Sequence, residues 1–332
     1  MLADLLRRQL LLASELLNIH RSYENRLSIV IHILKKRYPI AVSFRNIHLK
    51  ALMNRRALQL PWFILLQQGH FNGRGYRIIC DIERSTAVIV SADKRNKKLV
   101  KLTNCINNGD LLGIFVKAEY KALPVQGRIV IDVGANIGDS STYFILQGAQ
   151  KVVALEPYPA NYQIASENVK INNLEDRIKL LFAGCSGKTQ TITLDNDLLE
   201  KQENSFYKLH DGTQVLVASE PNKSNAFYKL HDGTQVPLLS LHDVLEENIM
   251  ISDNDIILKM DCEGCEYDAI LSADRNVLRR FSHILIEYHY GYQNLKEKFR
   301  LAGFDISISR PIYSKTEDSR KMYRGTIFAK RL

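Results

Sequence analysis

The sequence predicts an α/β fold: a Rossmann-like, doubly wound, mostly parallel sheet with a closing antiparallel hairpin, plus an N-terminal helical and β extension. Apolar β-branched segments alternate with helical periods from residue 127 onward, whereas the first hundred residues follow a different pattern. Strands that alternate with helices normally lie parallel in one sheet. We therefore expect an extension over residues 1–110 and an α/β domain over 111–332.

The N-terminal extension is expected to begin with amphipathic helices. Apolar residues recur at helical spacing in two stretches of residues 2–36: Leu6, Leu10, Ala13 and Leu17, then Leu27, Val30, Ile31 and Leu34. Residues 1–60 carry eleven Lys/Arg against three Asp/Glu, which is +8 of the +9 formal charge. The apolar faces could dock on the protein, self-associate or lie on a membrane surface, and docking or self-association is preferred. Short β segments are expected at 76–80 and 86–90.

The α/β domain is expected to begin at a continuous β-branched strand, as in the buried centre of a parallel sheet. Strands are predicted at 129–133, 151–156, 178–183, 255–261, 283–289, 305–309 and 326–330, and helices at 139–147, 159–172 and 292–302. The last two strands have no helix between them, so they should pair as an antiparallel hairpin at one edge.

An internal repeat interrupts this alternation. The sequence FYKLHDGTQV occurs at residues 206–215 and again at 227–236. Each copy contains an Asp-Gly pair, which favours a tight hairpin. A duplicated surface insertion near 204–236 is preferred over a flap on the substrate side. His210 and His231 are then equivalent surface residues and not a metal pair.

A glycine turn after the first strand of the domain predicts a nucleotide cofactor. Gly134 allows a sharp turn and close approach to the backbone, and Gly138 allows close contact where the next helix begins. The N–H groups at that helix start favour a carboxylate of the ligand. Glu156 closes the second strand, where a carboxylate can accept the hydroxyl groups of an adenosine ribose.

The residues of the same turn distinguish between two classes of cofactor. A nicotinamide fingerprint has glycine two positions after the first, to admit a pyrophosphate, but this chain has Asn136 there. Asp132 precedes the turn, and an acidic turn suits the free amino group of S-adenosylmethionine (SAM). SAM is therefore the predicted cofactor.

Three blocks of the sequence resemble the FkbM-type family of class I methyltransferases. They are IDVGANIGDSSTYF (131–144), VVALEPYPANYQIASENVKINN (152–173) and ILKMDCEGCEYDAIL (257–271), the last matching the family pattern K-x-D-x-E-G-x-E. The resemblance implies SAM-dependent O-methylation of a sugar, glycolipid or secondary-metabolite hydroxyl. It also implies a cofactor role for Asp132, Gly134, Asn136, Gly138 and Glu156.

The acceptor side is expected at the ends of the fourth and fifth strands. Asp261, Glu263 and Glu266 follow the fourth strand, while Glu287 and His289 end the fifth. Methyl transfer needs alignment of the reactants and a base for the hydroxyl proton. We expect Asp261 to position cofactor or substrate, and Glu263 or His289 to be the base. Helix capping by the acids is the alternative, and no metal site is predicted, although clustered carboxylates could hold a divalent cation.

The five cysteines do not form a disulfide framework, and Cys262-Glu-Gly-Cys265 is interpreted as two incidental thiols because a second ligand pair or a thioredoxin-like setting is not evident. No apolar run reaches the about 18–20 residues of a membrane span, and no signal peptide is recognised, so a cytoplasmic enzyme is expected. Two alternatives remain: a nucleic-acid methyltransferase that uses the basic N-terminal region, and a non-catalytic SAM-binding protein. Nucleic acid is the less favoured partner, because no base-methylation or RNA-binding motif is recognised.

Overall fold

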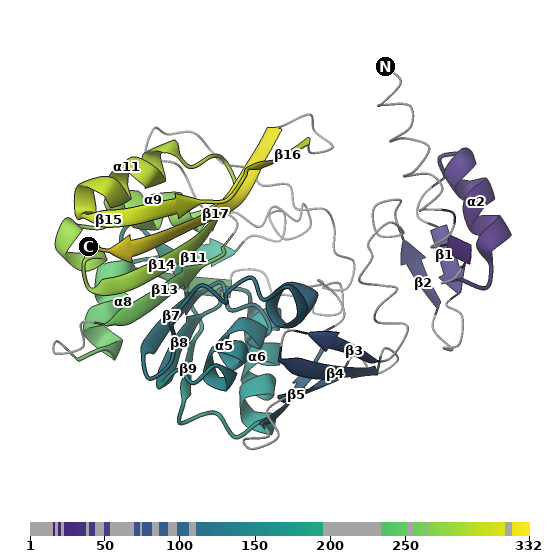
Figure 1. Cartoon of the computed structure of the whole chain (residues 1–332), viewed down its shortest axis with the longest axis horizontal. Helices are drawn as coiled ribbons and strands as arrows, with labels where there is room; N and C mark the ends of the chain where they lie inside the picture. The colour runs from purple at the N-terminus through teal and green to yellow at the C-terminus, as the bar shows by residue number, and fades with distance from the viewer. Residues whose placement is uncertain are drawn as a thin grey trace. The chain divides into compact units, whose positions relative to one another are not determined.

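Figure 1 shows a computed structural model of the chain. It describes residues 16, 19–20, 23–37, 40–43, 50–53, 70–73, 75–81, 86–91, 98–105, 111–194, 234–250, 255–262, 264–315 and 321–332. The chain divides into two compact units, Met1–Lys117 and Ala118–Leu332.

The first unit contains one described α-helix, two small sheets and a π-helix. The antiparallel sheets have the orders β1-β2 and β3-β4-β5-β6. Alternation in β4 buries Tyr76, Ile78 and Cys80 on one face. The short segments predicted near 76–80 and 86–90 are confirmed as β4 and β5. The elements are α2 (Arg26–Leu34), β1 (Ile40–Ser43), β2 (Lys50–Met53), β3 (His70–Gly73), β4 (Tyr76–Asp81), β5 (Thr86–Ser91), β6 (Leu99–Thr103) and η1 (Leu112–Lys117).

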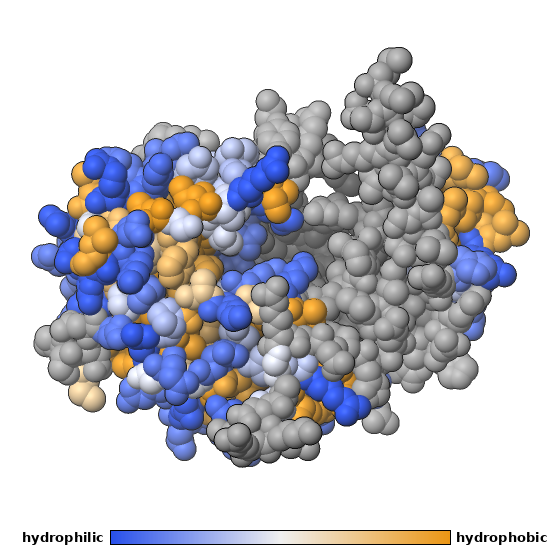
Figure 2. All heavy atoms as spheres, viewed as in Figure 1, coloured by the Kyte–Doolittle hydropathy of each residue, from blue (hydrophilic) through white to orange (hydrophobic). Residues whose placement is uncertain are grey.

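The helix α2 carries an exposed apolar stripe. Ile29 is fully buried, whereas Leu27 and Leu34 are 72% and 77% exposed and Ile31 is also exposed. Figure 2 shows this stripe as a hydrophobic patch over α2. Within the residues described, no helix combines the length and the apolar character needed to cross a membrane.

The second unit is built on one large sheet, ordered β15-β17-β14-β13-β7-β8-β9 (Figure 1). The five strands from β14 to β9 in that order are parallel, and β17 is antiparallel to both β14 and β15. This confirms the predicted sheet and its antiparallel closing pair, with the last strand inserted inside the edge. The strands are β7 (Ile129–Val133), β8 (Lys151–Leu155), β9 (Ile178–Leu181), β13 (Ile256–Met260), β14 (Phe281–Tyr288), β15 (Phe304–Ile308) and β17 (Lys321–Arg331).

Helices cover both faces of this sheet. Ile131 and Val133 of β7 belong to the core cluster that also holds residues of α8, α9, α10 and α11. Because side chains alternate along a strand, Val130 and Asp132 face the other side, which α5 and α6 cover. The helices are α5 (Asp139–Leu146), α6 (Pro159–Ile171), α8 (Leu241–Asn248), α9 (Cys265–Ser272), α10 (Arg275–Leu278) and α11 (Gln293–Ala302).

Four short or peripheral strands were not predicted. β16 (Ile312–Lys315) pairs with β17, and β10 (Gly184–Ser186), β12 (Thr234–Ser240) and β11 (Gln190–Leu194) form a small sheet in that order. Residues 195–233 connect the paired ends of β11 and β12. The last three residues of the second repeat copy begin β12. The predicted hairpins, with His210 and His231, lie outside the described residues.

Candidate active site

A buried ion pair joins the two central strands of the sheet. Asp132 of β7 and Lys259 of β13 are cross-strand neighbours, and Lys259 Nζ lies 3.0 Å from Asp132 Oδ1. Both side chains are almost fully buried. Ser140 and Ser141 donate their hydroxyl hydrogens to Asp132 Oδ2 at 2.7 and 2.6 Å. Asp132, which is predicted to contact the cofactor, therefore also stabilises the start of α5.

Lys259 is a site residue to which the sequence prediction gave no role. Its ammonium donates to the carbonyl oxygen of Gly134 at 2.8 Å. Burial opposes its charge, yet Asp132, Asp261 and Asp139 outweigh that cost and raise its pKa, so it stays protonated. The available signals were a single charged residue in the otherwise apolar strand IILKM and its position as the lysine of the pattern K-x-D-x-E-G-x-E.

The glycine turn after β7 is closed by the protein's own backbone. Gly134 has φ +77°, and a Cβ there would lie 1.9 Å from the carbonyl oxygen of Asp261. The Asp261 N–H in turn donates to Val133 O at 3.1 Å. The close approach that Gly134 permits is thus made by the loop after β13, in addition to any made by a ligand. Gly138, with φ +82°, directly precedes α5, and a Cβ there would lie at an ordinary 3.5 Å from Ala165.

Glu156 ties the second strand to the same turn. It directly follows β8 and is buried. Its Oε2 accepts the Asn136 N–H at 2.8 Å, and its Oε1 accepts the Tyr158 N–H at 3.0 Å. Burial raises its pKa to about 7, although the two backbone hydrogen bonds act in the opposite direction. The five predicted cofactor residues therefore lie together: Gly134, Asn136 and Gly138 in one turn, Asp132 in the strand that leads into it, and Glu156 bonded to it.

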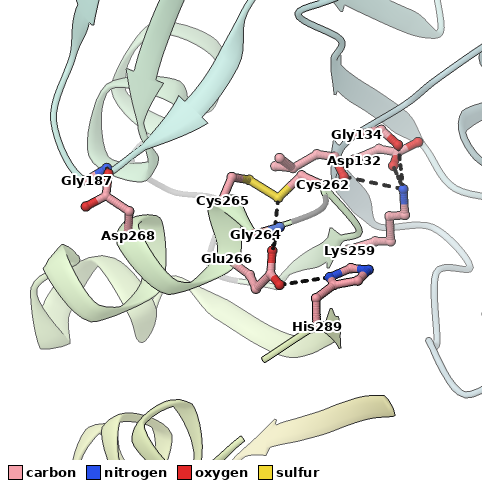
Figure 3. The surroundings of a disulfide bond; sticks show 11 residues. Asp132, Gly134, Gly187, Lys259, Cys262, Gly264, Cys265, Glu266, Asp268 and His289 are labelled. Carbon is pink, nitrogen blue, oxygen red and sulfur yellow. Dashed lines mark hydrogen bonds and ion pairs between the residues drawn. A yellow bond between two sulfur atoms is a disulfide. The ribbon is translucent and has the colours of Figure 1, made fainter. Parts of the chain in front are cut away.

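A disulfide follows β13, so the interpretation of two incidental thiols was wrong. Cys262 and Cys265 are bonded across a short turn, with their Cα atoms 5.6 Å apart (Figure 3). Gly264, between them, has φ +121° and precedes α9. Glycine adopts this left-handed backbone without the strain that a side chain would cause, and the turn can therefore close. The structure thus adds a covalent bridge to the predicted acceptor side.

Among the acids that the structure describes after β13, Glu266 is the one that hydrogen-bonds to His289. Glu266 Oε1 lies 3.0 Å from His289 Nδ1, and Oε2 accepts the Gly264 N–H at 2.8 Å (Figure 3). Both side chains are buried, and His289 is 1% exposed. Glu266 was named among the acids of this loop but was given no role, although the family pattern ends on it. Glu263, the other predicted base, lies outside the described residues.

Tyr267 fixes the segment that carries His289. Its hydroxyl donates to Gly291 O at 2.6 Å and accepts the Tyr290 N–H at 2.7 Å. These two bonds attach α9 to the residues that directly follow His289. The imidazole is therefore held from both sides, by Glu266 and by the backbone next to it.

The charges of the site fit a cationic ligand. Asp132, Asp139 and Asp261 all raise the pKa of Lys259, so three carboxyl groups interact electrostatically with one ammonium. A surplus of carboxyl groups favours positive charge. The sulfonium and ammonium groups of SAM supply such charge.

A parallel sheet whose first strand ends in a glycine turn, bonded to the acid that closes the second, is typical of domains that bind nucleotide cofactors. More specifically, this chain belongs to the FkbM methyltransferase family. The model of the methyltransferase FkbM domain matches residues 132–306, just over half of the chain. Membership implies the use of SAM.

Several known methyltransferases are similar to parts of this chain. The ribosomal protein L11 methyltransferase of Carboxydothermus hydrogenoformans is 32% identical over 91 residues, 26% of this chain and 30% of that protein. Methyltransferase sdnD of Sordaria araneosa is 28% identical over 178 residues, 48% of this chain and 65% of that protein. The crystal structure of methyltransferase FkbM from Methylobacillus flagellatus has 18% identity and a TM-score of 0.35, over 61% of this chain and 43% of that one. The chain spans less than two thirds of each of these relatives.

Proposed function

We propose that this protein is a SAM-dependent O-methyltransferase acting on a hydroxyl group of a sugar, glycolipid or secondary metabolite. The observation that carries the proposal is the hydrogen bond between Glu156 Oε2 and the Asn136 N–H. It places the acid that would receive the ribose directly beside the turn that would receive the methionine portion of SAM. The family match supports methyl transfer, and the hydroxyl acceptor is our own inference.

The glycine turn and Glu156 bind the cofactor in this proposal. Glu156 accepts the ribose hydroxyls, and the start of α5 receives the carboxylate. Asp132 holds the turn in position through its contacts with Ser140, Ser141 and Lys259. SAM supplies an already activated methyl group, so the protein has only to align the reactants and remove one proton.

The Glu266–His289 pair removes that proton. With Nδ1–H donated to Glu266, the imidazole carries its basic lone pair on Nε2. Glu266 stabilises the imidazolium that forms when the acceptor hydroxyl loses its proton. Asp261, whose backbone contacts Gly134, positions the loop between cofactor and acceptor.

Calorimetry with pure protein tests the cofactor. SAM and its demethylated product should both bind, and Glu156→Ala should weaken SAM binding about tenfold, which corresponds to about 1.4 kcal/mol. The matched control is Glu167→Ala, an exposed acid of α6, which should leave the affinity unchanged. Tight binding of a dinucleotide without uptake of SAM would overturn the proposal.

Turnover of labelled SAM in a cell extract, with the product identified by mass spectrometry, tests the acceptor. His289→Ala should lower the rate of methyl transfer roughly 10²–10⁴-fold, with SAM affinity retained, as expected for loss of a general base. Glu266→Gln should lower the rate by less, because the histidine remains. Full turnover by both variants would exclude this base. A steep loss of activity with added salt would instead favour a nucleic-acid acceptor.

The exposed stripe of α2 supports a contact made through the N-terminal helices, either with a second copy of the chain or with a membrane surface. Leu27, Ile31 and Leu34 form it. The double substitution Leu27→Ser/Leu34→Ser should abolish self-association in light scattering or binding to anionic vesicles. No change in either measurement would remove this partner from the proposal.

A further inference from the structure

The bridge between Cys262 and Cys265 joins one partly exposed residue to one buried residue. Cys265 is fully buried as the first residue of α9, whereas Cys262 is partly exposed. The other three cysteines, Cys80, Cys105 and Cys185, are free and buried. Of the two bridged residues, Cys262 is therefore the one that offers a thiol in solution a way to the bridge.

The bridge lies between the two halves of the candidate site. Cys262 Sγ lies 3.6 Å from Glu266 Oε2, whose other oxygen meets His289 (Figure 3). On its other side, Cys262 follows Asp261, whose carbonyl oxygen fills the space beside Gly134. A change at the sulfurs therefore acts on the histidine pair and on the cofactor turn alike.

We propose that Cys262 and Cys265 form a reversible dithiol–disulfide couple that controls the candidate site. The co-reactant is a small thiol reductant. Its thiolate attacks Cys262 Sγ, the bond between the two protein sulfurs breaks, and Cys265 leaves as a thiolate that takes up a proton. A second reductant thiolate attacks the reductant sulfur of the mixed disulfide, and Cys262 is released and protonated. Two reductant thiols become one disulfide, and the protein gains two hydrogens.

The position of Cys265 favours this direction of exchange. The N-terminus of a helix stabilises a thiolate, and a better-stabilised thiolate leaves faster. Cys265 begins the eight-residue helix α9, whereas Cys262 stands outside it. The couple is therefore built so that the exposed sulfur is attacked and the buried one departs.

Reduction removes the covalent link across the turn and creates a thiol that can donate to Glu266 Oε2. The Asp261 backbone is then held against Gly134 by hydrogen bonding alone. We expect the reduced protein to bind SAM at least about fivefold more weakly than the oxidised protein, at the lower end of ordinary coupling between sites. This expectation rests on the proposed cofactor, whereas the thiol chemistry does not.

Alkylation in denaturant, after the folded protein has been oxidised or reduced and the reagent removed, followed by mass spectrometry, tests the couple without SAM. Protein oxidised by a disulfide reagent should carry three alkyl groups, on Cys80, Cys105 and Cys185, and reduction of the folded protein should raise the number to five. Cys185→Ala should lower both numbers by one and leave the pair unchanged. Five alkyl groups in the oxidised sample, or reduction that requires denaturant, would overturn the proposal.

Hydrogen exchange and SAM titration test the control of the site. Reduction should speed amide exchange at Gly264 and Glu266 and lower SAM affinity, while Cys262→Ser/Cys265→Ser should show the same values in either condition. Identical exchange in the oxidised and reduced wild type would overturn the control, even if SAM does not bind. In the disulfide-bonded structure, Cys262, Cys265 and Glu266 place three atoms that could bind a metal within 4.8 Å of one another, so reduction could free two thiolate ligands there. One tightly held zinc ion per reduced chain, protecting both thiols, would replace the couple with a metal site.

Discussion

The turn after β7 and the loop after β13 meet at Gly134 and Asp261, yet they are held in different ways. The turn rests on noncovalent contacts between strands: the Asp132–Lys259 pair and the Glu156–Asn136 hydrogen bond. The loop rests on a disulfide and on side chains of the helix that follows it. The turn is thus fixed by the register of the sheet, whereas the loop can be altered by a single reaction.

The contacts that hold the loop after β13 are concentrated at the start of α9. Four consecutive side chains of this helix attach it to three other segments. Cys265 bonds to Cys262, Glu266 bonds to Gly264 and His289, and Asp268 accepts the Gly187 N–H at 2.7 Å (Figure 3). Tyr267 bonds to Tyr290 and Gly291. The disulfide therefore lies beside the side chains that hold the other two segments.

Removing Lys259 tests the noncovalent side most severely. Lys259→Met should lower the free energy of unfolding by about 3–5 kcal/mol, because it leaves the buried Asp132 carboxylate without its counter-charge. Urea denaturation measures the change. Asp132→Asn/Lys259→Met should recover part of the loss, since no uncompensated charge remains.

The exposed Lys170 of α6 supplies the control for this measurement. Lys170→Met should change the stability by no more than about 0.5 kcal/mol. A cost of that size for Lys259→Met as well would mean that the ion pair does not hold the turn.

The two glycines of the turn test where the turn and the loop touch. Gly134→Ala should cost about 2–5 kcal/mol, because a left-handed residue costs about 1–2 and overpacking against the Asp261 carbonyl about 1–3. Gly138→Ala should cost only the about 1–2 kcal/mol of the left-handed backbone, since its Cβ would meet Ala165 at an ordinary distance. Thermal unfolding compares the two variants, and equal costs would contradict the close contact at Asp261.

The sequence predicted the turn better than the loop, for a physical reason. Continuous apolar, β-branched runs and glycine spacing placed β7, β8, Gly134 and Glu156 correctly in the chain, because each is a local signal. The role of Lys259 depends on the register between β7 and β13, whose partners Asp132 and Lys259 are 127 residues apart, and a local pattern does not set that register. The disulfide was missed because C-x-x-C spacing alone does not say whether the turn closes. That depends on the left-handed backbone of Gly264.

The titration of Glu156 gives a subtler test of the noncovalent side. Its pKa rises from an ordinary 4.5 to about 7 on folding, chiefly through burial. Between these values the folded protein holds a proton that the unfolded chain has lost. Stability therefore falls as pH rises from about 4.5 to about 7, by up to roughly 3 kcal/mol. Glu156→Gln cannot titrate at this position. The free energy of unfolding of the variant should therefore rise relative to that of the wild type across this window and then level off.

Urea denaturation at several pH values measures that difference. Gln offers one carbonyl oxygen to the two backbone N–H groups of Asn136 and Tyr158, so it adds a constant cost that does not change with pH. Glu297→Gln is the matched control, because Arg300 lowers the pKa of that exposed carboxyl, so folding does not add a proton to it in this window. Parallel stability curves for wild type and Glu156→Gln would show that the carboxylate keeps its charge on folding. The acid beside the turn would then meet a ribose as a full anion at every pH above about 5.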